Sequence, residues 1–181
     1  MPKSKEFLKN VPETWKEIKD LPFSIGAGRA VSSELDDQTK VLNKFFMDTP
    51  SGLIYGRLRM GYIAEGPPLH VHGGASAYFL DEAMGVTSWA FDIPSVAAKL
   101  NFEYHQVAPL FQELETRSYL SKVTPTHLEI KAELRVLDGD LLVSGFGDFR
   151  VLNRSKMEKL LSSVDPENYA IDLDRYSWAP E

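Results

Sequence analysis

The chain has 181 residues, of which 43% are hydrophobic and 25% are charged, a composition typical of globular proteins and too polar for a membrane protein. The formal net charge is −6 and the basic residues are dispersed, which argues against a nucleic-acid partner. Because the chain has no cysteine, disulfides, thiolate metal sites and a cysteine nucleophile are excluded.

No apolar run reaches the roughly 18 residues that a bilayer span needs. The first residues carry mixed charges and lack the apolar stretch of a secretory signal, so we expect a cytosolic protein with no membrane partner. The length suits one domain of ordinary size with additions at its ends. We divide the chain into an N-terminal extension (1–40), a central domain (41–152) and a C-terminal extension (153–181).

The N-terminal extension predicts a short amphipathic helix that packs onto the domain. Apolar residues are interspersed with charges over residues 3–21, and Pro12 suits the first position of a helix over 13–20. Residues 22–40 have the composition of a loop.

Two strands are then predicted at 41–47 and 53–63, joined by a turn that contains Pro50 and Gly52.

The central helix is the most informative element. From Gly74 to about Phe91 the residues are apolar or small on nearly every side, as expected of a helix enclosed by protein. Asp81 and Glu82 are the exceptions. An ionised carboxylate among apolar groups costs several kcal/mol unless it meets a partner, a cavity or an interface. Both acids are therefore candidate functional residues.

The rest of the chain predicts consecutive antiparallel strands. An alternating pattern places Val96, Ala98, Leu100, Phe102 and Tyr104 on one buried face, and residues 128–136 alternate in the same way. A less regular strand at 113–123 lies between them. Asp138–Gly139 indicates a hairpin into residues 141–152, and a short helix follows at 156–163. A long helix that needs covering and several such strands predict an α+β fold in which a curved antiparallel sheet wraps around the helix.

The chain resembles the hotdog-fold acyl-CoA thioesterases of the PaaI-like group, within the 4-hydroxybenzoyl-CoA thioesterase superfamily, over about residues 50–152. Three features carry this resemblance: His72-Gly73-Gly74, the acid nine residues after that histidine at Asp81, and the strand 98–104 followed by Ala108-Pro109-Leu110. It implies a hotdog fold with N- and C-terminal helical extensions, and hydrolysis of an acyl thioester, with a coenzyme A ester as the expected substrate. No cofactor and no metal are expected.

The resemblance also implies roles for individual residues. The Gly73 position gives the N–H that binds the oxyanion, and the acid at the Asp81 position, contributed across a dimer interface, acts as general base or nucleophile. We expect a homodimer or a dimer of dimers. A helix that begins near Gly73 has unpaired N–H groups and the positive end of its dipole, both suited to polarising a carbonyl oxygen. We expect the substrate to contact Gly74, Glu82, Ala97 and Ala98.

Helical spacing distinguishes the two acids. The neighbours of Asp81 at three- and four-residue spacings are mostly small, whereas those of Glu82 are bulkier. We therefore assign the chemistry to Asp81 and treat Glu82 as a supporting acid. The alternative for either acid is a salt bridge at a subunit interface. His72 is a candidate for orienting the oxyanion loop, and the alternative is a hydrogen bond at the helix start.

The remaining histidines and some departures from the family leave other interpretations open. His70 and His72 alternate like the metal ligands of cupins, but no glutamate follows at a short distance and a helix is predicted where a cupin needs strands. His105 and His127 occupy polar, solvent-facing strand positions. Ala97 stands where the family often has Ser or Thr, and His105-Gln106 where it often has basic residues. The substitution of Ala97 and the lack of basic residues at His105-Gln106 favour another alternative to the enzyme: a hotdog module that binds an acyl thioester or another apolar ligand without catalysis.

Overall fold

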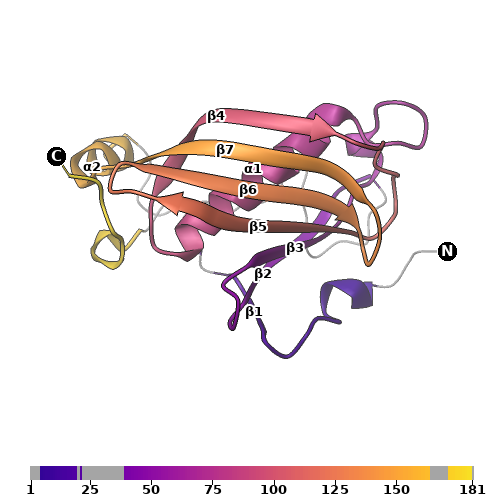
Figure 1. The fold of residues 1–181 in the computed structure, drawn as a ribbon, viewed down its shortest axis with the longest axis horizontal. Coiled ribbons are helices and arrows are strands. Elements are labelled where there is room, and N and C mark those ends of the chain that lie inside the picture. The colour runs from indigo at the N-terminus through magenta and orange to yellow at the C-terminus, as the bar shows by residue number, and fades with distance from the viewer. Residues whose placement is uncertain (1–4, 20, 22–38, 164–170, 181) are drawn as a thin grey trace.

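The computed structural model describes residues 5–19, 21, 39–163 and 171–180. One long helix, α1 (Gly73–Ala90), packs against an antiparallel sheet of seven strands in the order β1-β2-β3-β5-β6-β7-β4 (Figure 1). The strands are β1 (Trp15–Glu17), β2 (Leu42–Asp48), β3 (Ile54–Arg59), β4 (Ser95–Tyr104), β5 (Leu114–Val123), β6 (His127–Val136) and β7 (Leu141–Val151). The predicted α+β fold, a sheet curved around a central helix, is confirmed.

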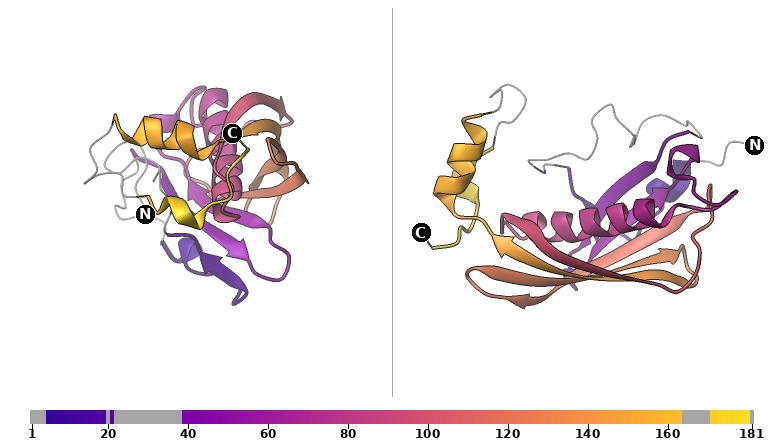
Figure 2. Two further views of the ribbon diagram at one scale, coloured as in Figure 1. Left: turned by 90° about the vertical axis from the view of Figure 1, so that its left-hand side faces the viewer. Right: turned by 90° about the horizontal axis from the view of Figure 1, so that it is seen from above.

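The core lies between α1 and the concave face of the sheet, as the view from above in Figure 2 shows. Phe79, Leu80 and Met84 of α1 are buried against side chains that alternate inward along the strands. On β6 these are Leu128, Ile130, Ala132 and Leu134, while the residues between them point to the opposite face. The helix is thus held rigidly along its length, which fixes where its first turn and its two acids lie.

Gly147 of β7 lies where the core has no room for a side chain. A Cβ added there would overlap the Phe149 ring and lie 3.0 Å from Met84 Sδ. We expect Gly147→Ala to lower the free energy of unfolding by about 1–3 kcal/mol, because overpacking forces neighbouring side chains to shift. Urea denaturation measures the loss. An unchanged urea midpoint would contradict the packing described here.

The N-terminal segment differs from its prediction. Residues 15–17 form strand β1, which pairs with β2. The prediction of an α-helix over 13–20, and with it the prediction of an α-helical N-terminal extension, is therefore wrong. A short 3-10 helix (Lys5–Leu8) precedes it and buries Phe7 and Leu8. Trp15 stacks on Tyr55 with the ring centroids 4.0 Å apart. Pairing with the β2 edge and this aromatic contact stabilise extended backbone over a helix.

Two smaller differences concern the strands before α1 and the loop beside them. The strand predicted for 53–63 ends at Arg59, and a 3-10 helix occupies Tyr62–Ala64. The loop predicted for 22–40 lies outside the described residues except for its last two positions.

Strand β4 contains a bulge that the alternating pattern did not predict. The register with β7 shifts between Ala97 and Lys99, so that Val96 pairs with Arg150 and Ala97 pairs with the buried Phe149. Ala97, not Val96, therefore faces the helix side, and Val96 is 50% exposed. The prediction that Val96 and Ala98 share the buried face is wrong. Ala98 is the extra residue of the bulge and is exposed, and its insertion reverses the alternation before it. β4 is also an edge strand of the sheet.

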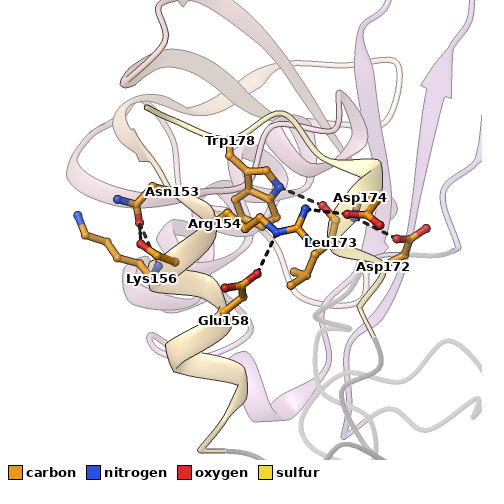
Figure 3. A network of polar contacts seen from close by, with 9 residues as sticks. Asn153, Arg154, Lys156, Glu158, Asp172, Leu173, Asp174 and Trp178 are labelled. Atoms are coloured by element: carbon orange, nitrogen blue, oxygen red, sulfur yellow. Dashed lines mark hydrogen bonds and ion pairs between the residues drawn. The ribbon is translucent and has the colours of Figure 1, made fainter. Parts of the chain in front are cut away.

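The C-terminal helix is confirmed as α2 (Arg154–Leu161). Arg154 bonds to Glu158 at 2.9 Å and to Asp174 at 2.7 Å, and the Trp178 indole N–H donates to the Leu173 carbonyl (Figure 3). A 3-10 helix (Leu173–Arg175) belongs to the same segment. Directly after this helix, the Tyr176 ring contacts the Trp89 ring, with the centroids 5.2 Å apart, so residues 171–180 cover the C-terminal end of α1.

None of the described helices is long and apolar enough to cross a membrane.

Candidate functional site

The first turn of α1 holds one backbone donor with no acceptor. The His72 carbonyl accepts from the N–H groups of Ala75 and Ser76 at 2.9 and 3.2 Å, and His72 Nδ1 accepts from Gly74 N–H at 2.9 Å. Within the described part of the chain, the Gly73 N–H has no hydrogen-bond partner. It lies at the positive end of the dipole of an 18-residue helix. A carbonyl oxygen or an oxyanion is the group that such a donor binds best.

His72 is the N-cap of the helix. Because its Nδ1 accepts a hydrogen bond, the neutral ring carries its proton on Nε2. This geometry agrees with the alternative in which His72 makes a hydrogen bond at the helix start, and it also orients the turn that contains Gly73. The hydrogen bond at the helix start is therefore observed, and the role of His72 in orienting an oxyanion loop stays a prediction.

Asp81 and Glu82 lie half-buried on the side of α1 that the chain's own sheet does not cover. Burial raises the pKa of Asp81 above its usual value. Burial, with a smaller contribution from the Asp81 charge, raises the pKa of Glu82 to about 7. Neither carboxylate has a hydrogen-bond or ion-pair partner among the described residues. Two desolvated carboxylates without a counterion lower the stability of the fold. A hydrogen-bond donor or a positively charged group that approached them would therefore be bound favourably.

The raised pKa of Glu82 predicts how stability depends on pH. A carboxyl whose pKa is raised in the folded state binds more protons folded than unfolded, so the free energy of unfolding falls as pH rises from about 4.5 to about 7. Glu82→Gln removes this dependence. We expect the variant to be more stable than wild type at pH 8 by about 1–2 kcal/mol, and equally stable at pH 4. Urea midpoints at both pH values measure this difference, and parallel pH profiles would contradict it.

A single chain does not bring the predicted groups together. Asp81 lies eight residues after Gly73 on the same helix, which corresponds to about 12 Å along its axis. Gly74 is exposed at the helix start, and Ala97 and Ala98 are exposed on β4. Beside the acids, a Cβ added at Gly85 would meet no atom within 4 Å, so this face of the helix is open.

The structure also shows a residue that the sequence did not indicate. The hydroxyl of Tyr104, at the end of β4, donates to the Gly73 carbonyl at 2.9 Å. The alternating pattern predicted only that Tyr104 shares the buried face, and it is 52% exposed. Nothing in the spacing of residues 73 and 104 reveals their contact, because it depends on how β4 runs back along α1.

The other histidines form local contacts. His70 Nδ1 lies 2.9 Å from the Pro68 carbonyl, and His105 Nε2 lies 2.9 Å from Ser144 Oγ. His127 is partly buried and contacts Thr126 and Arg150. No three His, Asp or Glu residues in the described segments are grouped to hold a metal. The helix that begins directly after His72 excludes the cupin arrangement, which needs strands there.

Comparisons with known proteins agree with this fold. Residues 70–143 match the family model described as thioesterase superfamily. Protein RHA08564, described as a thioesterase superfamily protein, is 30% identical with a TM-score of 0.57, and the match covers 60% of this chain and 53% of that one. The chain thus spans about half the length of that relative. No curated protein matches the chain.

Two further solved structures are similar to this chain. Protein PA5202 from Pseudomonas aeruginosa is 26% identical with a TM-score of 0.51, over 56% of this chain and 82% of that one. A hypothetical thioesterase from Streptococcus pneumoniae TIGR4, solved with coenzyme A, is 12% identical with a TM-score of 0.53, over 55% and 80% of the two chains, and shows the fold alone. Residues 70–143 therefore carry the thioesterase superfamily pattern within a hotdog fold, as the resemblance implied.

Proposed function

We propose that this protein hydrolyses acyl thioesters of the coenzyme A type to a free acid and a thiol, at a site shared by two copies of the chain. The observation that carries the proposal is the unpaired Gly73 N–H at the start of α1. The thioesterase superfamily match over residues 70–143 supports the reaction class. The coenzyme A in the similar Streptococcus structure supports the choice of thiol.

The separation of Gly73 and Asp81 supports a dimer. A second copy whose α1 runs antiparallel, with a twofold axis near Ala77, would place Asp81 of the partner subunit opposite Gly73. The small side chains at Gly74, Ala77 and Gly85 allow such an approach. The exposed edge strand β4 offers unpaired backbone groups that a second copy would cover. We propose a homodimer, alone or paired into a dimer of dimers.

The reaction follows from these positions. The substrate carbonyl oxygen would accept a hydrogen bond from Gly73 N–H. The ionised Asp81 of the partner subunit would either take a proton from the attacking water or attack the carbonyl carbon itself. The resulting oxyanion is stabilised by the N–H and the helix dipole, a contribution of roughly 3–4 kcal/mol in other enzymes. Collapse of the tetrahedral intermediate breaks the carbon–sulfur bond and expels the thiolate, which is protonated to the thiol. If Asp81 acts as general base, this step gives the free acid directly. If Asp81 attacks as nucleophile, the step leaves an acyl anhydride on Asp81, and a water molecule then hydrolyses that anhydride to the free acid and the carboxylate.

The remaining predicted residues would surround the substrate. We propose that Gly74, Glu82, Ala97 and Ala98 line the bound acyl thioester, and that His72 orients the oxyanion turn. Ala97 faces the helix side of β4 and has no side-chain hydroxyl for a hydrogen bond with water. The attacking water would therefore depend on Asp81 and Glu82 for its position.

A thiol-release assay over acetyl-CoA to palmitoyl-CoA and benzoyl-CoA tests the proposal. We expect release from at least one ester. The second candidate function, a non-catalytic binding module, is favoured by Ala97 and by the absence of a basic pair at His105-Gln106. Calorimetric binding of an acyl-CoA without any thiol release would support that module and contradict hydrolysis.

A further inference from the structure

The Gly73 N–H is held in place through the two peptide groups around it. The peptide between His72 and Gly73 is anchored by its carbonyl, which accepts from Ala75 and Ser76. The N–H of the next peptide, between Gly73 and Gly74, donates to His72 Nδ1. Because each peptide group is planar, fixing one end of it also fixes the direction of the other end.

Tyr104 completes this arrangement from outside the helix. Its hydroxyl donates to the Gly73 carbonyl, which is the second end of the peptide between Gly73 and Gly74. Its ring lies beside the same residue, with ring carbons 3.4 and 3.6 Å from the position of a Cβ on Gly73. Strand β4 therefore contacts the helix start at the residue that carries the unpaired N–H.

We propose that Tyr104 is a positioning residue that holds the Gly73–Gly74 peptide and, through the Gly73 Cα that this peptide shares with the preceding one, keeps the free Gly73 N–H pointing at the substrate carbonyl. The inference rests on the proposed function. Tyr104 touches none of the reacting atoms in this role. Without its hydroxyl, the glycine-rich turn would be held only by His72 and the helix, and two successive glycines leave the backbone free to rotate. An oxyanion donor that moves loses part of its stabilisation of the transition state.

Tyr104→Phe tests this role because it removes one oxygen and keeps the ring. Tyr119→Phe is the matched control, since Tyr119 is also exposed on a strand but lies far along β5 from the helix start. With the best acyl-CoA ester, we expect Tyr104→Phe to lower kcat roughly three- to ten-fold and to leave KM within two-fold. The control should match wild type. A raised KM with unchanged kcat would overturn the proposal and indicate substrate contact.

Amide spectra of ¹⁵N-glycine-labelled protein give a readout independent of activity. The Gly73 and Gly74 resonances should shift in Tyr104→Phe and not in Tyr119→Phe, and unchanged resonances would overturn the proposal. If wild type hydrolyses no ester, the proposed function fails, and these spectra alone decide whether Tyr104 holds the Gly73–Gly74 peptide. If Asp81→Asn is as active as wild type while Tyr104→Phe is slow, the role of Asp81 fails and that of Tyr104 remains.

Discussion

Asp81→Asn is expected to lower kcat for thioester hydrolysis by about 10²–10⁴-fold, the usual contribution of a general base. Asparagine has nearly the same shape but cannot accept a proton from water or attack as a carboxylate. Because burial disfavours the charge of Asp81, its removal should leave the stability unchanged or raised. A loss of activity would then reflect chemistry and not unfolding. Thiol release at pH 8 and a thermal melt measure the two effects.

Glu82→Gln is the matched control for this variant. It makes the same change from acid to amide one residue along the helix, at a more deeply buried carboxyl. We expect it to keep at least about a tenth of the wild-type kcat, because Glu82 is proposed to support Asp81 and not to replace it. Equal rates for Asp81→Asn and wild type would remove the catalytic role of Asp81. A larger loss in Glu82→Gln than in Asp81→Asn would exchange the roles of the two acids.

The elements of the central domain could be predicted from periodicity because their burial is regular. The predicted helix from Gly74 to about Phe91 agrees with α1 to within one residue at each end, and the strand at 113–123 agrees closely with β5. In both elements the core contacts repeat along the chain. Periodicity fails where one contact decides the structure, as at Trp15, whose stacking on Tyr55 joins β1 to the sheet.

The site was predictable in part for a similar reason. Asp81 and Glu82 contrast with the apolar helix that holds them, and the glycines mark its start. The contact of Tyr104 with Gly73 and the bulge after Ala97 depend on how β4 lies against α1 and β7, which no local pattern records. The same limit applies to the proposed second subunit, since the sequence reveals two buried acids in α1 without showing which group would approach them.

Gly73→Ala should remove activity without removing the fold. A Cβ at this position would make ordinary van der Waals contact with the Tyr104 ring, at 3.4 Å, so the chain itself tolerates it. Alanine also favours helix over glycine. Because the methyl group is bonded to the same Cα as the free N–H, we expect it to hinder the approach of the substrate carbonyl to that N–H. We expect kcat/KM to fall by about 100-fold, with an unchanged or higher melting temperature.

Mixing Gly73→Ala with Asp81→Asn then tests whether the site is shared between subunits. In a mixed dimer, one site combines the intact Gly73 of one subunit with the intact Asp81 of the other, and the second site carries both defects. After the two variants are unfolded together and refolded, about half of the dimers are mixed, so about a quarter of wild-type activity should return. Each variant refolded alone is the control and should stay inactive. If both groups act within one subunit, every site in the mixture carries one defect and no activity returns.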